Sequence, residues 1–293
     1  MEIPWILDRC ILCLDNGVLS KEHIIPEQLG GKLWSKILCK NCNDQIGHEI
    51  EADIKKDPSI RFALEGIKLE APDTYKKLSS GLEFIAISNH GKVKGKIKNN
   101  EFNPRTYREK DGSIIQATKN AKQSIRRILE KQNQSNDEIT KKLLVVENAP
   151  LNELIKLDDN FEFIKRGIDE IHPDLTGEMI NDIVLLKIAY EFLALHLGNY
   201  IYQDSLQPIR DFILNKTKDP SFCEVEYLRT TRYEAFHGMF IEQKQPCIWV
   251  QIRLFGWLVY RVKFPNLALD EGTERVVYQI DLKTNTEDCG KID

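Results

Sequence analysis

The sequence has no long hydrophobic run, and this absence excludes an integral membrane protein built from helices. No stretch of the 293 residues approaches the roughly 18 consecutive apolar residues that a membrane-spanning helix needs. The first residues contain no basic region followed by an apolar region, so the sequence predicts no secretory signal. We therefore expect a cytoplasmic protein with no membrane partner.

The chain also lacks an excess of positive charge. Its formal net charge is −4 at pH 7, which argues against a protein that coats DNA with its whole surface. The charge is unevenly distributed, because residues 86–132 contain 12 basic and 4 acidic residues, whereas residues 133–293 contain 18 and 27. Residues 1–60 are acidic as well, with 7 basic and 10 acidic residues. The positive charge is therefore concentrated in one block.

Seven cysteines are present, and in an intracellular chain they favour metal binding over disulfides. Four of them form two Cys-x-x-Cys pairs, Cys10 with Cys13 and Cys39 with Cys42, separated by 25 residues. Each pair offers two thiolates to one tetrahedral ion, and the spacing is typical of a four-cysteine zinc site. The segment is too short to bury a sufficient core alone, so we expect zinc to contribute to its folding, on the order of 10 kcal/mol or more. The alternative is a chance pairing of cysteines.

The residues around the two cysteine pairs narrow the interpretation. Glu22 and His23 are adjacent, Pro26 and a double glycine follow them, and Asn43 comes directly after Cys42. This pattern, Glu-His-x-x-Pro…Leu-Gly-Gly…Cys-x-x-Cys-Asn, resembles the HNH endonuclease family over residues 10 to about 53, less than a fifth of the chain. The resemblance implies a small ββα-metal module, treble-clef-like, in which a hairpin with the histidine packs on a helix with the asparagine.

The same resemblance implies catalytic roles for three residues. His23 would be the general base that deprotonates the attacking water, and Glu22 and Asn43 would bind a catalytic divalent ion, Mg²⁺ or Mn²⁺. These residue types suit the chemistry, because a neutral imidazole is a base near pH 7 and a hard cation prefers oxygen ligands. One position departs from the pattern, since Ser35 stands where the family has its middle asparagine, which braces the hairpin. The alternative for His23 is a buried structural histidine.

The rest of the chain reads as a mixed α+β protein. We expect helices at 44–56, 58–69, 119–132, 176–199 and 204–215, of which 176–199 is apolar on most faces and therefore a core helix. Strands are expected at 82–87, 92–98, 113–117, 143–146, 161–165, 235–242, 247–254, 257–263 and 275–282. The pattern divides the chain into the nuclease module at 1–62, a basic segment at 63–135 and an acidic α+β domain at 136–293.

The basic block offers candidate contacts to nucleic acid. Strict alternation along residues 92–98 places four lysines on one face of a strand, and the following helix adds two arginines. The predicted DNA-binding residues are Lys92, Lys94, Lys96, Lys98, Arg126 and Arg127. Such contacts to phosphates give affinity without sequence preference. The alternative is that the lysines are the solvent face of an edge strand, which they protect from aggregation.

These observations favour a metal-dependent DNA endonuclease or nickase. The family resemblance adds an association with bacterial antiviral defence or with mobile elements. Two alternatives stay open: a non-catalytic zinc-binding module that binds nucleic acid or protein, and a nuclease that cleaves RNA. The acidic domain at 136–293 contains no second catalytic motif, and three alternatives stay open for what it recognises: a partner protein, a regulatory ligand or another nucleic-acid feature.

Overall fold

The structure is a computed structural model of the chain, and it divides into two compact units. Unit 1 comprises residues 1–79 and 175–293, and unit 2 comprises residues 80–174. The described residues are 1–52, 54–88, 91–98, 101–108, 113–158, 161–176, 180, 182–215, 224–229, 234–244, 246–265, 267 and 275–292. This division differs from the expected boundaries, because the basic segment ends within unit 2 and residues 1–79 share a unit with the C-terminal part of the chain.

The N-terminal part of unit 1 is the expected ββα arrangement. Strands β1 (Leu19–His23) and β2 (Trp34–Cys39) pair as an antiparallel hairpin, and helix α1 (Lys40–Ile46) begins directly after β2. The predicted helix at 44–56 is only partly correct. Regular α-helix ends at Ile46, a π-helical turn covers Gly47–Glu51, and a short 3₁₀ turn covers Ile54–Lys56.

Two short helices follow the module. Helix α2 (Pro58–Gly66) begins at Asp57, which accepts a hydrogen bond from the backbone N–H of Ser59 over 2.6 Å. Pro58 occupies the first helical position, where the missing N–H costs nothing. Helix α3 (Pro72–Leu78) also begins with a proline and supplies residues to the candidate site.

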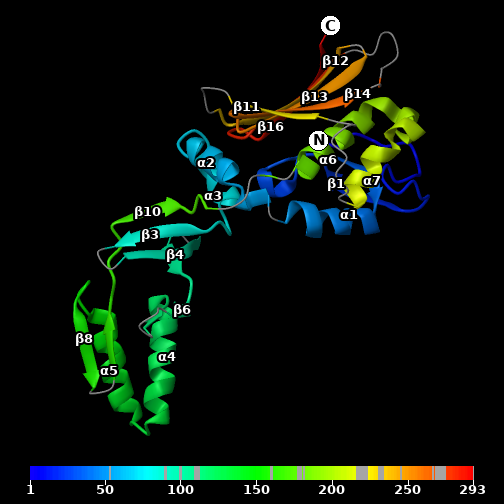
Figure 1. Ribbon diagram of the computed structural model, residues 1–293. Coiled ribbons are helices and arrows are strands. Elements are labelled where there is room, and N and C mark those ends of the chain that lie inside the picture. Colours follow the sequence, from blue (N-terminus) through cyan, green and yellow to red (C-terminus); the bar gives the residue numbers. More distant parts are fainter. Residues whose placement is uncertain are drawn as a thin grey trace. The chain divides into compact units, whose positions relative to one another are not determined.

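The C-terminal part of unit 1 is a six-stranded antiparallel sheet packed on a buried helix (Figure 1). The strands lie in the order β11-β14-β13-β12-β15-β16. Their bounds are β11 Glu224–Arg229, β12 Phe236–Lys244, β13 Cys247–Leu254, β14 Leu258–Pro265, β15 Arg275–Asp281 and β16 Thr286–Ile292. Helix α6 (Asp182–Leu197) contacts β11, β13 and β14, and α7 (Gln207–Asn215) packs on α6. Burial of nearly all α6 side chains confirms the predicted core helix.

Unit 2 contains a small sheet and a helical hairpin. Its sheet has the order β10-β3-β4-β5, and the remaining strands form two-stranded pairs β6–β7 and β8–β9. The bounds are β3 Phe84–Ser88, β4 Gly91–Lys98, β5 Glu101–Pro104, β6 Tyr107–Arg108, β7 Ile114–Ile115, β8 Leu154–Asp158, β9 Phe161–Ile164 and β10 Glu170–Pro173. Helices α4 (Thr118–Lys131) and α5 (Asn136–Asn148) pack together through Ile125, Leu129, Ile139 and Val146.

The strand expected at 143–146 is wrong, because these residues belong to α5. A short apolar run does not distinguish a strand from a helix by its periodicity. The deciding signal is upstream, where Ser135 and Glu138 form a capping box: the Ser135 hydroxyl accepts from the Glu138 N–H, and the Glu138 carboxylate accepts from the Ser135 N–H. This cap starts a helix that continues through the apolar run.

The fold class is therefore α+β, with an N-terminal ββα module, as expected. Among the residues that the structure describes, no helix combines the length and the apolar character needed to span a membrane.

Candidate active site

The four paired cysteines converge on one point at the base of the hairpin. Their sulfur atoms all lie within 4.8 Å of one another, and the Sγ atoms of Cys13 and Cys39 are 3.7 Å apart. The first pair lies on a tight turn in which the Leu14 N–H donates to the Cys10 carbonyl, and the second pair spans the junction of β2 and α1. The structure therefore confirms that these cysteines form a group able to hold one metal ion.

The electrostatics of this cysteine cluster explain why it suits a cation. A hydrogen bond from the Cys42 thiol lowers the pKa of Cys10 to about 5, and the same bond raises the pKa of Cys42 far above its usual range. Burial raises the pKa of Cys13 to about 12. Four thiols so close together cannot all ionise without a positive charge between them. The donor set fits a tetrahedral ion with four thiolate ligands, the usual arrangement for structural zinc.

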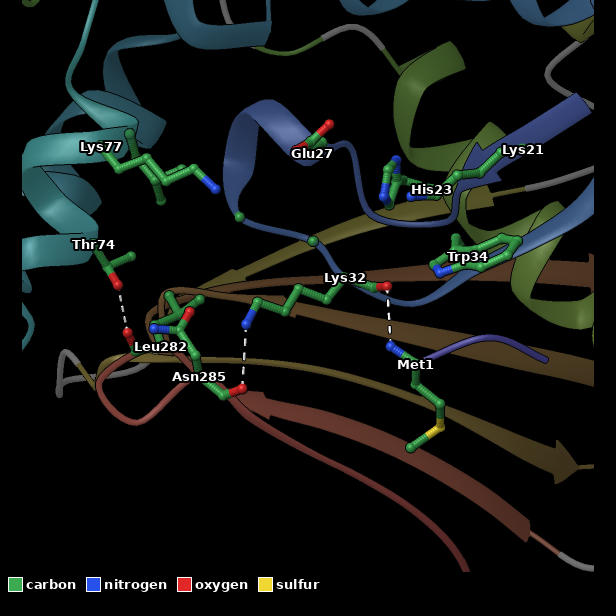
Figure 2. Close-up of a pocket in the computed structure, with 13 residues that line it drawn as sticks. Met1, Lys21, His23, Glu27, Lys32, Trp34, Thr74, Lys77, Leu282 and Asn285 are labelled. Atoms are coloured by element: carbon green, nitrogen blue, oxygen red, sulfur yellow. Dashed lines mark hydrogen bonds between the residues drawn. The ribbon is translucent and has the colours of Figure 1, made fainter.

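His23 is the last residue of β1, and it lines a cavity of about 260 Å³ (Figure 2). It pairs in register with Trp34 of β2, which lines the same cavity. Burial lowers the pKa of His23, the positive charge of Lys21 lowers it further, and Glu27 opposes the shift. The imidazole is therefore neutral at pH 7 and able to accept a proton, as a general base must.

The loop between β1 and β2 shapes this pocket and depends on the double glycine. After Pro26 the chain makes a single 3₁₀ turn, and Gly30 then adopts a left-handed conformation with φ of 96°. Gly31 lies so close to the backbone of Ile25 that an added Cβ would be 1.8 Å from its carbonyl oxygen. Only glycine fits at this crossing, which returns the chain to Trp34 beside His23.

Residues far from the module in sequence complete the wall of the pocket. Thr74, Lys77 and Leu78 come from α3, and Leu282 and Asn285 come from the turn after β15. The Thr74 hydroxyl donates to the Leu282 carbonyl over 2.5 Å, and the Lys32 Nζ donates to the Asn285 carbonyl over 3.2 Å (Figure 2). Sequence reasoning missed these residues. The one available signal was Lys32, which directly follows the double glycine.

Glu22 lies next to His23 but is part of a buried ion-pair cluster. Its Oε1 atom is 2.5 Å from the Nζ of Lys187, a fully buried lysine of α6. The same ammonium lies 2.7 Å from Glu51 and 2.9 Å from Glu191. We call these four residues the Lys187 cluster. Sequence reasoning also missed it, although a lysine and a glutamate four residues apart in an apolar helix could have indicated a buried pair.

The charges in the Lys187 cluster are strongly coupled. Burial alone would lower the pKa of Lys187, but the three surrounding carboxylates raise it well above its ordinary value. Burial raises the pKa of Glu22 and of Glu191, and the attraction of Lys187 opposes the rise. Lys187 is therefore a fixed positive charge that holds Glu22 in place. Because Glu22 has this partner, its role as a metal ligand stays a prediction.

Asn43 lies against the strand that carries Glu22 and His23. Its Nδ2 atom donates to the Lys21 carbonyl over 2.8 Å and to the Ser20 hydroxyl over 3.0 Å. The side chain therefore fixes the backbone of β1 immediately before the two candidate catalytic residues. Its predicted role as a metal ligand also stays a prediction.

Ser35 is fully buried and directly opposite Glu22 in the hairpin. Its hydroxyl donates to the carbonyl of Ile3 over 2.6 Å, so it attaches the N-terminal segment to β2. The serine that replaces the family's middle asparagine thus braces the hairpin through the N-terminal segment.

The predicted DNA-binding residues all belong to unit 2. Lys92, Lys94 and Lys96 are exposed on one face of β4, with Val93 and Gly95 buried between them. The alternative expectation of an edge strand is wrong, because β4 pairs with β3 on one side and with β5 on the other. Lys94 pairs with the buried Asp174 over 2.6 Å, which offsets part of its charge. Arg126 and Arg127 are exposed on α4, and the side chain of Lys98 lies outside the described part of the chain. Contact with DNA stays a prediction for this group.

Comparison with known proteins finds a family match within the N-terminal module. Residues 10–59 match the sequence model of a family described as HNH endonuclease, in agreement with the resemblance seen in the motifs. No curated protein and no solved structure matches the chain. The matched segment includes the four cysteines, Glu22, His23 and Asn43, and it excludes Lys77 and Lys187.

Proposed function

We propose that the chain, whose residues 10–59 match the HNH endonuclease family, is a metal-dependent nuclease that hydrolyses phosphodiester bonds in DNA, as an endonuclease or nickase. The observation that supports this most is a neutral, half-buried imidazole at the edge of a lysine-lined pocket. A structural zinc module needs neither the histidine nor the pocket. A role in antiviral defence or in a mobile element belongs to the proposal through the family resemblance.

In this proposal His23 accepts the proton of the attacking water. General base catalysis of this kind is worth about 10²–10⁴-fold in rate. The ammonium groups around the pocket attract the phosphodiester backbone of the substrate to the site. Asn43 and the double-glycine loop keep the end of β1 and the pocket wall in place.

The two metals have different roles. Cys10, Cys13, Cys39 and Cys42 would hold zinc, and because they fill all four tetrahedral positions its role is structural. Glu22 and Asn43, a carboxylate and an amide on adjoining elements, would hold Mg²⁺ or Mn²⁺. This oxygen donor set fits a hard cation that keeps several waters, and when bound the ion supplies Lewis-acid stabilisation of the phosphate. Because Lys187 already offsets the charge of Glu22, we expect the divalent ion to bind weakly.

Two observations favour a second candidate, a non-catalytic zinc module that binds nucleic acid. The Glu22 carboxylate has a cationic partner within the protein, and Ser35 replaces the asparagine of the motif. A protein that kept the scaffold and lost the metal site would show both features.

The test is nicking of a supercoiled plasmid with Mg²⁺ or Mn²⁺, compared with cleavage of a single-stranded RNA. We expect the wild type to nick the plasmid and His23→Ala to lose at least about 10²-fold in rate. His48→Ala is the matched control, since His48 is an exposed histidine of the same module. Activity that survives in His23→Ala would remove the mechanism. Binding of nucleic acid without cleavage would favour the non-catalytic module. Cleavage of RNA alone would identify the chain as an RNA nuclease.

A further inference from the structure

The pocket beside His23 has a charge opposite to that of the chain. Three lysines line it, Lys21, Lys32 and Lys77, and among the described residues of the lining the only carboxylate is that of Glu27. The whole chain has a net charge of −4, and residues 1–60 are acidic. Lysines gathered around a concave surface raise the local concentration of anions, because the protein walls focus the field.

Each lysine is placed by a different part of unit 1. The Lys21 ammonium lies 4.8 Å from the ring centroid of Trp34, a cation–π contact that keeps it at the pocket. Lys32 lines the pocket, and its Nζ donates a hydrogen bond to the Asn285 carbonyl. Lys77 comes from α3, and Figure 2 shows its side chain extending toward the loop that carries Glu27. The Thr74–Leu282 hydrogen bond joins α3 to the turn after β15.

The chemistry of the lysine side chain favours phosphate as the anion for this pocket. Lysine is a point charge that contacts phosphate without the bidentate geometry by which arginine reads guanine or clamps a carboxylate. The volume, about 260 Å³, is just below the roughly 300–1,000 Å³ of typical ligand pockets, so it suits a phosphate group and its sugar. A site of this kind holds the backbone of a nucleic acid and does not read its sequence.

We infer that this pocket binds a backbone phosphate of the nucleic-acid substrate that neighbours the phosphate at His23, with Lys32 and Lys77 as its ligands. The inference rests on the proposed nuclease function and adds the substrate subsite to it. Lys77 lies outside the matched segment 10–59, so one of the two phosphate ligands comes from a part of the chain that the family model does not cover. It also places phosphate contacts inside unit 1, whereas the sequence directed attention to the lysines of unit 2.

The experiment measures binding of a fluorescent DNA oligonucleotide across a range of salt concentrations. All variants carry His23→Ala, so cleavage does not interfere. We expect Lys32→Glu and Lys77→Glu each to weaken binding and to reduce the slope of log K against log salt by about 1. The matched controls are Lys76→Glu on α3 and Lys36→Glu on β2, since both lysines are exposed and neither lines the pocket. Lys32→Gln and Lys77→Gln repeat the test with smaller changes if a charge reversal impairs folding.

The same variants in the active protein test the link to catalysis. We expect the KM for plasmid nicking to rise more than kcat falls, because the lost contact binds substrate and transition state alike. If the wild type nicks DNA and the Lys32 and Lys77 variants bind it as tightly as the controls, the inference fails and the proposed function stands. If the wild type cleaves nothing, the proposed function fails, and weaker DNA binding by these two variants alone still supports the phosphate site. If they lose affinity for inorganic phosphate but not for DNA, the inference is wrong, because the pocket then serves a free anion.

Discussion

The cysteine cluster and the pocket beside His23 share one hairpin, yet they are assembled in different ways. All four cysteines lie within the matched segment 10–59, one pair on a tight turn and the other at the junction of β2 and α1. The pocket needs α3 and the turn after β15, and the neighbouring Glu22 needs Lys187 of α6. The residues able to hold a metal ion are therefore close together in sequence, whereas the pocket depends on distant parts of the chain.

Buried hydrogen bonds connect the C-terminal sheet to the loop that shapes the pocket, and they connect α6 to the first cysteine pair. His237 of β12 donates from Nε2 to the Leu29 carbonyl over 2.8 Å, and its Nδ1 accepts from the Phe255 N–H over 3.1 Å. Tyr190 of α6 donates to the carbonyl of Ile11, between the first two cysteines. The sheet and α6 therefore support the module structurally.

The largest effect is expected from removing one thiol of the cysteine cluster. Cys42→Ser removes one of four thiolates, and zinc binding in such modules contributes on the order of 10 kcal/mol to folding. We expect the variant to lose its zinc, measured by a colorimetric chelator assay, and to show the greatest fall in Tm of any variant described. Cys247→Ser is the matched control, because Cys247 is half-buried and lies outside the cluster. Retention of one zinc per chain with an unchanged Tm would contradict the assignment.

The second effect tests the long-range support of Glu22. Lys187→Met leaves three carboxylates around a buried position without their cation, a change that costs about 3–5 kcal/mol when one partner of a buried pair is removed. We expect urea unfolding to show this loss and plasmid nicking to fall while zinc stays bound. Adding Glu191→Leu removes one of the stranded charges and should recover part of the stability. A Lys187→Met protein as stable and active as the wild type would show that the module does not depend on α6.

The third effect concerns pH and His237. Burial lowers the pKa of His237 to about 4, so the unfolded chain binds a proton there more readily than the folded protein. Its contribution to stability is complete above pH 6.5 and is lost as the pH falls toward 4. The pKa of His196 is also lowered to about 4 by burial, so both histidines add to the slope. We expect His237→Gln to reduce the dependence of unfolding free energy on pH in this window, measured by urea unfolding. The exposed His172→Gln should leave it unchanged, and equal slopes in both variants would refute this role.

The smallest effect is expected in unit 2. Lys94→Glu with Lys96→Glu should weaken DNA binding and flatten its salt dependence, but less than reversal at Lys32 and Lys77. The reason is that Lys94 already pairs with Asp174, so part of its charge is offset. Binding assays on both pairs of variants rank the two regions directly. A larger loss from the unit 2 pair would make β4 the main DNA-contacting surface, and no change would show that its lysines do not contact DNA.

Local signals in the sequence predicted the cysteine cluster and most of the elements. Two Cys-x-x-Cys pairs bring their own ligands together, and the apolar run of α6 predicted a buried helix. The strand expected at 143–146 failed because the capping box at Ser135 outweighs a short apolar run. Lys77 could not be assigned, because only tertiary packing brings α3 to the pocket. Glu191 offered a local signal for Lys187, but its other partners, Glu22 and Glu51, lie far away in sequence. The net negative charge of residues 1–60 gave no indication of the pocket, because Lys21 and Lys32 of this segment lie together at one concave surface.

The central claim is that His23 is a neutral base at the pocket, and a pH–rate profile tests it most directly. Under single-turnover conditions with saturating Mg²⁺, plasmid nicking by the wild type should rise to a plateau by pH 7. The midpoint of this rise should lie below 6.5, because burial lowers the pKa of His23. His23→Ala should be slower at the plateau and should lack this rise. A wild-type midpoint above 6.5, or the same profile in His23→Ala, would contradict the account.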